Sequence, residues 1–125
     1  MSQVADCVFV VDDEPAIRSA LRLLLRGDGY AVKTYESAVD ALQAYDAEPP
    51  ACVLTDYHMP GMDGLQLIRE IHRRDANMPV IILTGRDDSG RIRLDEKVRL
   101  LEKPFDAQVL TELVRILIEQ NRQLR

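Results

Sequence analysis

Residues 54–65 read LTDYHMPGMDGL. An apolar run ends on an acid, Asp56, and the chain then breaks at the dipeptides PG and DG. Residues 8–15, VFVVDDEP, repeat the arrangement, with Asp12 and Asp13 at the end of another apolar run. Apolar runs of this length, bounded by turn residues, predict buried strands that end at a polar edge.

The composition predicts a single globular domain. The chain has 125 residues, of which 46% are apolar, so it can bury a core of ordinary size. The net charge of -5 and the pI near 5.0 argue against direct nucleic-acid binding by this chain. No apolar run approaches the roughly 18 residues that a membrane helix needs, and residues 1–4 do not resemble a signal peptide. We therefore expect a cytoplasmic protein in which Cys7 and Cys52 are reduced core residues.

Short apolar runs alternate with segments of helical period along the chain. The predicted strands are Cys7–Val11, Ala31–Tyr35, Cys52–Thr55, Val80–Leu83 and Val98–Leu101. The predicted helix faces are Ile17/Ala20/Leu21/Leu24, Ala38/Ala41/Leu42/Tyr45, Gly64/Leu67/Ile68/Ile71 and Leu110/Leu113/Val114/Leu117. This alternation predicts a parallel α/β sheet with helices on both faces. We expect one domain over residues 1–125, with its core at about 4–120. Residues 119–125 are expected to be either a fraying helix end or a tail that begins a linker.

Polar groups occupy the carboxyl ends of the predicted strands, where open α/β sheets bind ligands. Asp12 and Asp13 follow the first strand, Asp56 the third, Thr84 the fourth, and Lys103 the fifth. Adjacent carboxylates raise one another's pKa, and a hard cation such as Mg²⁺ relieves that conflict. An ammonium and a hydroxyl beside a carboxylate suit a phosphoryl group, and the carboxylate itself can form an aspartyl phosphate. Asp56 is the candidate phosphoacceptor.

The motifs VVDDEP, LTDYHMPGMDGL, VIILTG and EKPF resemble those of response-regulator receiver domains of two-component signalling, over Val4 to about Gln120. The resemblance implies a doubly wound, flavodoxin-like (βα)5 fold with sheet order 2-1-3-4-5. It also implies phosphotransfer to Asp56 from a sensor histidine kinase or a phosphotransfer protein. Thr84 and Lys103 would then bond the phosphoryl oxygens.

The resemblance further implies a Mg²⁺ site. Its ligands would be Asp13, Asp56 and the backbone carbonyl of His58, with Asp12 acting largely through water. Pro104 follows Lys103 as in the family's usual Lys-Pro pair, whose peptide bond is commonly cis.

Two features depart from the family pattern. Leu100 stands where most members carry the aromatic residue that swings inward on phosphorylation. The connection between Thr84 and Lys103 is shorter than usual, and residues 86–97, RDDSGRIRLDEK, are highly charged. We therefore expect a short or irregular fourth helix and a switch that works through the order of this segment. A homodimer or output-domain contact is expected on the face formed by residues 86–118, where Val109, Ile116 and Ile118 add apolar surface.

Two other functions fit parts of the pattern. A metal-dependent phosphohydrolase would use Asp56 as its nucleophile, but it would need an acid two positions later, where this chain has His58, and a cap insertion, which the sequence lacks. A phosphate-independent scaffold of the same fold would not need the five polar groups that are all present. We therefore expect a signalling module that catalyses only its own phosphorylation and dephosphorylation.

Overall fold

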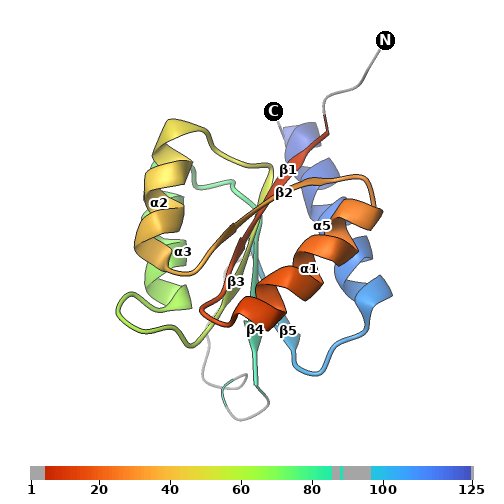
Figure 1. The fold of residues 1–125 in the computed structure, drawn as a ribbon. Helices are drawn as coiled ribbons and strands as arrows, with labels where there is room; N and C mark the ends of the chain where they lie inside the picture. Colours follow the sequence, from red (N-terminus) through yellow and green to blue (C-terminus); the bar gives the residue numbers. More distant parts are fainter. Residues whose placement is uncertain (1–4, 86–87, 89–96, 125) are drawn as a thin grey trace.

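The computed structural model describes residues 5–85, 88 and 97–124, in which five parallel strands form one sheet (Figure 1). The strands are β1 (Cys7–Val11), β2 (Ala31–Tyr35), β3 (Cys52–Asp56), β4 (Val80–Thr84) and β5 (Val98–Glu102). Their order is β2-β1-β3-β4-β5, which confirms the predicted flavodoxin-like α/β topology. The predicted short or irregular fourth helix falls on residues outside the described part of the chain.

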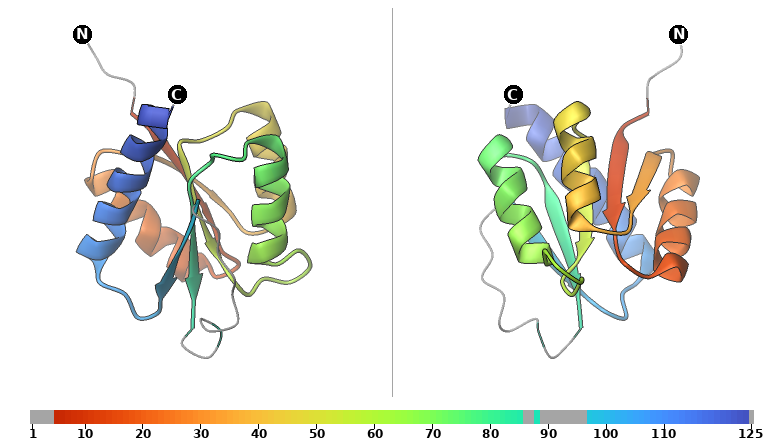
Figure 2. Two further views of the ribbon diagram at one scale, coloured as in Figure 1. Left: turned by 180° about the vertical axis from the view of Figure 1, so that it is seen from behind. Right: turned by 60° about the vertical axis from the view of Figure 1, so that its left-hand side comes forward.

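Four described helices cover the two faces of the sheet: α1 (Pro15–Gly27), α2 (Ala38–Ala47), α3 (Gly64–Arg74) and α5 (Ala107–Leu124). Helices α1 and α5 lie on one face, and α2 and α3 lie on the other (Figure 2). Pro15 begins α1. The first N–H groups of a helix have no partner within the helix, so proline loses no hydrogen bond at this position. Gly29 follows the helix with φ +96, a conformation that glycine adopts without strain.

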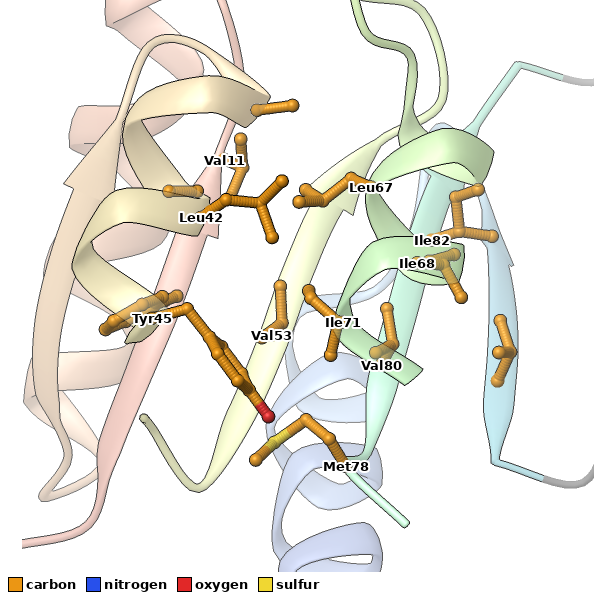
Figure 3. Packing of buried hydrophobic residues seen from close by; sticks show 14 of the residues in the cluster. Val11, Leu42, Tyr45, Val53, Leu67, Ile68, Ile71, Met78, Val80 and Ile82 are labelled. Atoms are coloured by element: carbon orange, nitrogen blue, oxygen red, sulfur yellow. The ribbon is translucent and has the colours of Figure 1, made fainter. Parts of the chain in front are cut away.

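The central strands are buried on both faces, which explains their continuous apolar sequences. Phe9 and Val53 pack toward α2 and α3, whereas Val8 and Leu54 pack toward α1 and α5. Figure 3 shows Leu42 of α2 and Leu67 of α3 pointing toward one another above the sheet. Each fully buried side chain of this size contributes roughly 1.5–3 kcal/mol, so these two clusters hold the strand ends in place.

Three strands extend one residue further than the sequence predicted, so that β3 ends at Asp56 and β4 at Thr84. The backbone pairing continues beyond the apolar runs because Tyr57 N donates to Leu83 O at 2.9 Å and Lys103 N donates to Thr84 O at 2.7 Å. The acid and the hydroxyl are therefore parts of the sheet, not of flexible loops.

The predicted helix faces are confirmed for α2, α3 and α5, and the predicted face of α1 needs correction. Ala20 of α1 is exposed, and Leu25 takes the core position because it lies one turn beyond Leu21 on the same face. Ile118 of α5 is buried and belongs to the core, so the predicted extra apolar surface reduces to Val109 and Ile116, which are 51% and 37% exposed.

Cys7 and Cys52 are both free thiols. Cys52 is buried, and that burial raises its pKa to about 12, so it stays protonated and unreactive. Cys7 is only half-buried, at the edge of the core. Among the described residues, no helix is long and apolar enough to cross a membrane.

Candidate functional site

Three carboxylates meet at the carboxyl ends of β1 and β3. Asp12 and Asp56 are buried, and Asp13 is exposed beside them. One carboxylate oxygen from each residue lies within 4.8 Å of the other two. The structure thus brings together the three acids that the sequence predicted as metal ligands.

The buried carboxylate of Asp12 is only partly satisfied by hydrogen bonds. Its Oδ1 accepts a hydrogen bond from Glu14 N at 2.9 Å, but its buried Oδ2 has no hydrogen-bond partner in the described part of the chain. Burial raises the pKa of Asp12, the Glu14 N–H opposes this, and the negative charges of Asp56 and Asp13 add to the increase. A buried carboxylate oxygen without a partner is costly. An oxygen-seeking divalent cation such as Mg²⁺ would satisfy it, so the donor set fits such an ion.

Lys103 provides the positive charge of the site. Its Nζ donates to Asp56 Oδ1 at 2.9 Å, which joins the end of β3 to the residue after β5. Partial burial acts to lower the pKa of Lys103, but the hydrogen bond and the charge of Asp56 outweigh it and raise the pKa. The ammonium therefore stays charged near neutral pH. The peptide bond between Lys103 and Pro104 is cis, as the resemblance implied.

Thr84 ends β4, next to the strand that carries Asp56, and its side chain is buried. Its hydroxyl donates to Gly85 O at 3.3 Å, so its single proton is directed at the backbone and not at the acids. That bond is longer than the usual O–H···O distance and is correspondingly weak. The hydroxyl is thus placed at the predicted strand end but is not yet bonded to the charged groups.

The loop after β3 is held in shape by its backbone. Gly64 N donates to Tyr57 O at 3.0 Å, and Asp63 caps α3 through a reciprocal capping box with Gln66. A Cβ atom on Gly64 would lie only 2.4 Å from the backbone oxygen of Asp56. Only glycine permits this approach of the helix to the acid. The sequence predicted Gly64 on the core face of this helix. A glycine on a core face was the feature that could have indicated this close approach.

The His58 ring makes contacts that the sequence did not predict. Its Nε2 lies 2.5 Å from Asp88 Oδ2, and its ring and that of Tyr57 form a T-shaped pair with centroids 4.7 Å apart. The two partners of this bond are 30 positions apart, so no local pattern could have revealed it. The proposed use of the His58 carbonyl as a metal ligand remains a prediction.

Arg18 of α1 is a second residue that sequence reasoning missed. Its Nη1 donates to the backbone oxygen of Asp12 at 2.7 Å. Arg18, Arg22 and Arg26 share one helix, and their spacing alone does not distinguish the first from the other two.

The chain matches known proteins over nearly its whole length. The family model described as the response regulator receiver domain matches residues 8–115. The transcriptional regulatory protein FixJ of Azorhizobium caulinodans is 38% identical over 93% of this chain and 58% of that protein. The C4-dicarboxylate transport transcriptional regulatory protein DctD of Pseudomonas aeruginosa is 36% identical over 94% of this chain. The chain spans only 28% of the length of DctD.

Solved structures agree with these relatives. A response regulator receiver domain protein from Clostridium thermocellum superimposes with a TM-score of 0.90 at 32% identity, over 98% of this chain and 100% of that one. The apo receiver domain of nitrogen regulatory protein C gives a TM-score of 0.82 at 36% identity, over 92% and 95% of the two chains. The strand order, the acidic cluster and these likenesses lead to one assignment: the chain belongs to the response regulator receiver domain family of two-component signal transduction.

Proposed function

We propose that the domain accepts a phosphoryl group on Asp56 from a sensor histidine kinase or a phosphotransfer protein, and that this modification switches a protein contact or an output domain. The observation that carries the proposal is the 2.9 Å bond between Lys103 and Asp56, beside two further carboxylates. A buried carboxylate that is paired with one ammonium, and that lies next to a cation-binding donor set, has the surroundings that a phosphoryl acceptor needs.

In the proposed step, a carboxylate oxygen of Asp56 attacks the phosphorus of the donor phosphohistidine. An O–P bond forms and the P–N bond breaks. Its electron pair goes to the imidazole nitrogen of the donor, which takes up a proton from solvent. Hydrolysis later reverses the modification when water attacks the phosphorus. We propose that this hydrolysis is slow, so that the domain acts as a timed switch and not as a metabolic enzyme.

Asp12, Asp13, Asp56 and the backbone carbonyl of His58 would hold Mg²⁺. When bound, the ion neutralises negative charge on the three acids and on the incoming phosphoryl oxygens. Lys103 would move its hydrogen bond from the acid to a phosphoryl oxygen. The hydroxyl of Thr84 would exchange its long bond to Gly85 for a shorter, charge-assisted one, and this gain in bond strength would draw Thr84 inward.

The names of the relatives support a transcriptional output for the whole protein. FixJ and DctD are both named transcriptional regulatory proteins, and both are longer than this chain. We propose that any nucleic-acid contact belongs to an attached or associated output domain, because the net charge of this chain is -5. The free thiols of Cys7 and Cys52 support a reducing, cytoplasmic setting.

The test is intact-mass measurement after incubation with Mg²⁺ and a small phosphodonor such as acetyl phosphate. One phosphate should be added to the wild type and none to Asp56→Asn, whereas Asp40→Asn, which changes an exposed acid on α2, should label normally. Labelling that persists in Asp56→Asn would refute the assignment. Multiple turnovers of a phosphomonoester would instead favour the phosphohydrolase, and partner binding that is unchanged in Asp56→Asn would favour the scaffold.

A further inference from the structure

Asp12 is held at three of its four hydrogen-bonding groups. Its N–H donates to Tyr35 O at 3.1 Å, its Oδ1 accepts from Glu14 N at 2.9 Å, and its backbone oxygen accepts from Arg18 Nη1 at 2.7 Å. The fourth group, Oδ2, is buried and has no hydrogen-bond partner among the described residues. Three fixed points therefore orient a residue whose carboxylate belongs to the acidic cluster.

The hydrogen bond from Arg18 differs from the other two because its donor belongs to a long side chain. Arg18 is a half-buried residue on the first turns of α1, where its own N–H donates to Glu14 O at 3.1 Å, and its guanidinium reaches back to the end of β1. The contact joins the helix to the strand end across the turn that carries both Asp12 and Asp13. A planar guanidinium loses little freedom per hydrogen bond, which suits it to hold a carbonyl in a fixed position.

We propose that Arg18 is a positioning residue for the cation site: it fixes the β1–α1 turn so that Asp12 Oδ2 and Asp13 face the cluster before the ion arrives. This inference rests on the proposed function, because it concerns the Mg²⁺ that the phosphotransfer requires. Partners that orient metal ligands from outside the ligand set typically contribute about 10–100-fold to metal affinity. Arg18 holds the backbone of a ligand and not its carboxylate, so the lower end of that range is expected.

The charge of Arg18 acts in the opposite direction. A cation beside the site repels Mg²⁺, so loss of the charge alone would tighten metal binding. The two effects of removing Arg18 therefore differ in sign, and the measured direction tells which one dominates. Positioning predicts weaker binding in Arg18→Met, which keeps much of the apolar stem and removes the donors.

The experiment is an NMR titration of the full chain with Mg²⁺, which reports affinity without reference to phosphorylation. We expect Arg18→Met to weaken binding by about tenfold, Arg18→Lys to restore most of the affinity, and Arg22→Met to match the wild type. Arg22 is the matched control because it is an exposed arginine one turn further along α1. With acetyl phosphate, Arg18→Met should label slowly at limiting Mg²⁺ and at the wild-type rate once Mg²⁺ is saturating.

The possible outcomes separate the inference from the proposed function. If the wild type binds Mg²⁺ and Arg18→Met binds it equally or more tightly, the positioning role is refuted and the proposed function stands. If Arg18→Met labels slowly even at saturating Mg²⁺, its effect is a general loss of structure, which also refutes the inference. If the wild type binds no Mg²⁺, the proposed function fails, and the role of Arg18 fails with it.

Discussion

Lys103 Nζ donates to Asp56 Oδ1 at 2.9 Å, although the two residues are 47 positions apart in the chain. The parallel sheet creates this pair because β4 lies between β3 and β5 and all three strands end at the same edge. The cis peptide bond at Pro104 follows directly after the lysine, and α5 begins only at Ala107. The strand order thus creates the charge pair, because Asp56 and Lys103 come within hydrogen-bond distance only in the folded sheet.

Asp13→Ala should remove most of the Mg²⁺ affinity. Asp13 is one of the three acids that share the cluster, and the loss of a charged ligand should cost at least the roughly tenfold that loss of an outer partner costs. Lys103→Ala should leave the affinity unchanged or slightly higher, because it removes a repelling charge, while it impairs the response to phosphorylation. Calorimetric titration with Mg²⁺ checks both variants. Equal affinities in the wild type and Asp13→Ala would reject this ligand set.

Gly64→Ala should destabilise the fold. The added Cβ would lie 2.4 Å from Asp56 O and 3.1 Å from Tyr57 Cα, and neither backbone atom can turn away as a side chain does. Forced overpacking of this kind costs about 1–3 kcal/mol in the free energy of unfolding. Urea denaturation provides the measurement. Gly27→Ala is the control, because a Cβ there meets no atom within 4 Å, and it should be neutral or mildly stabilising. Similar stabilities for the two variants would contradict the close approach.

Sequence reasoning located the strand ends because each apolar run stops at a polar residue, and the end-of-strand rule for parallel sheets then placed Asp12, Asp56 and Lys103 together. It could not find contacts that depend on how a loop or a helix side chain folds back. The tie from Arg18 to Asp12 and the bond from His58 to Asp88 are of this kind. Register within a helix face was also difficult to read when two neighbouring residues were both apolar. Leu24 and Leu25 are such a pair, and only Leu25 is fully buried.

Asp12→Asn should stabilise the metal-free protein at neutral pH. The folded state raises the pKa of Asp12 through burial, so between its ordinary value of 3.8 and the raised value the folded chain binds more protons than the unfolded chain. Stability from this group is therefore lost as the pH rises through that window, and an uncharged amide avoids the loss.

Thermal unfolding in a chelating buffer measures the effect. The advantage of Asp12→Asn should be present at pH 7 and should disappear as the pH falls below 3.8, where the wild-type carboxyl becomes neutral in both the folded and the unfolded state. Added Mg²⁺ should stabilise the wild type more than the variant, because only the wild type keeps the full set of charged ligands. If the variant is less stable than the wild type at pH 7 without metal, burial of the charged Asp12 carboxylate does not destabilise the fold, and the prediction is wrong.

Switching should proceed without an aromatic rotor, because Leu100 has no ring to swing. The structure places Leu100 on β5, half-buried against the core cluster beneath α2 and α3. Phosphorylation would instead act through Thr84, whose weak bond to Gly85 is easily exchanged, and through the chain that follows it. Residues 86–87 and 89–96 lie outside the described part of the structure, and Asp88 contacts His58 of the loop after Asp56. A small ligand such as a phosphoryl group can shift the conformational equilibrium of a segment if its contacts differ between the two conformations of that segment.

Hydrogen exchange with and without beryllofluoride, a mimic of the phosphoryl group, tests this route. We expect exchange in residues 86–97 to change on activation, while the central strands β1, β3 and β4 keep their protection because they are buried on both faces. Asp56→Asn should show no change, which separates the response from an effect of the reagent. Asp88→Asn should weaken the change at 86–97 if the contact with His58 transmits it. If residues 86–97 are as protected as the core strands and do not respond to beryllofluoride, the switch does not run through this segment.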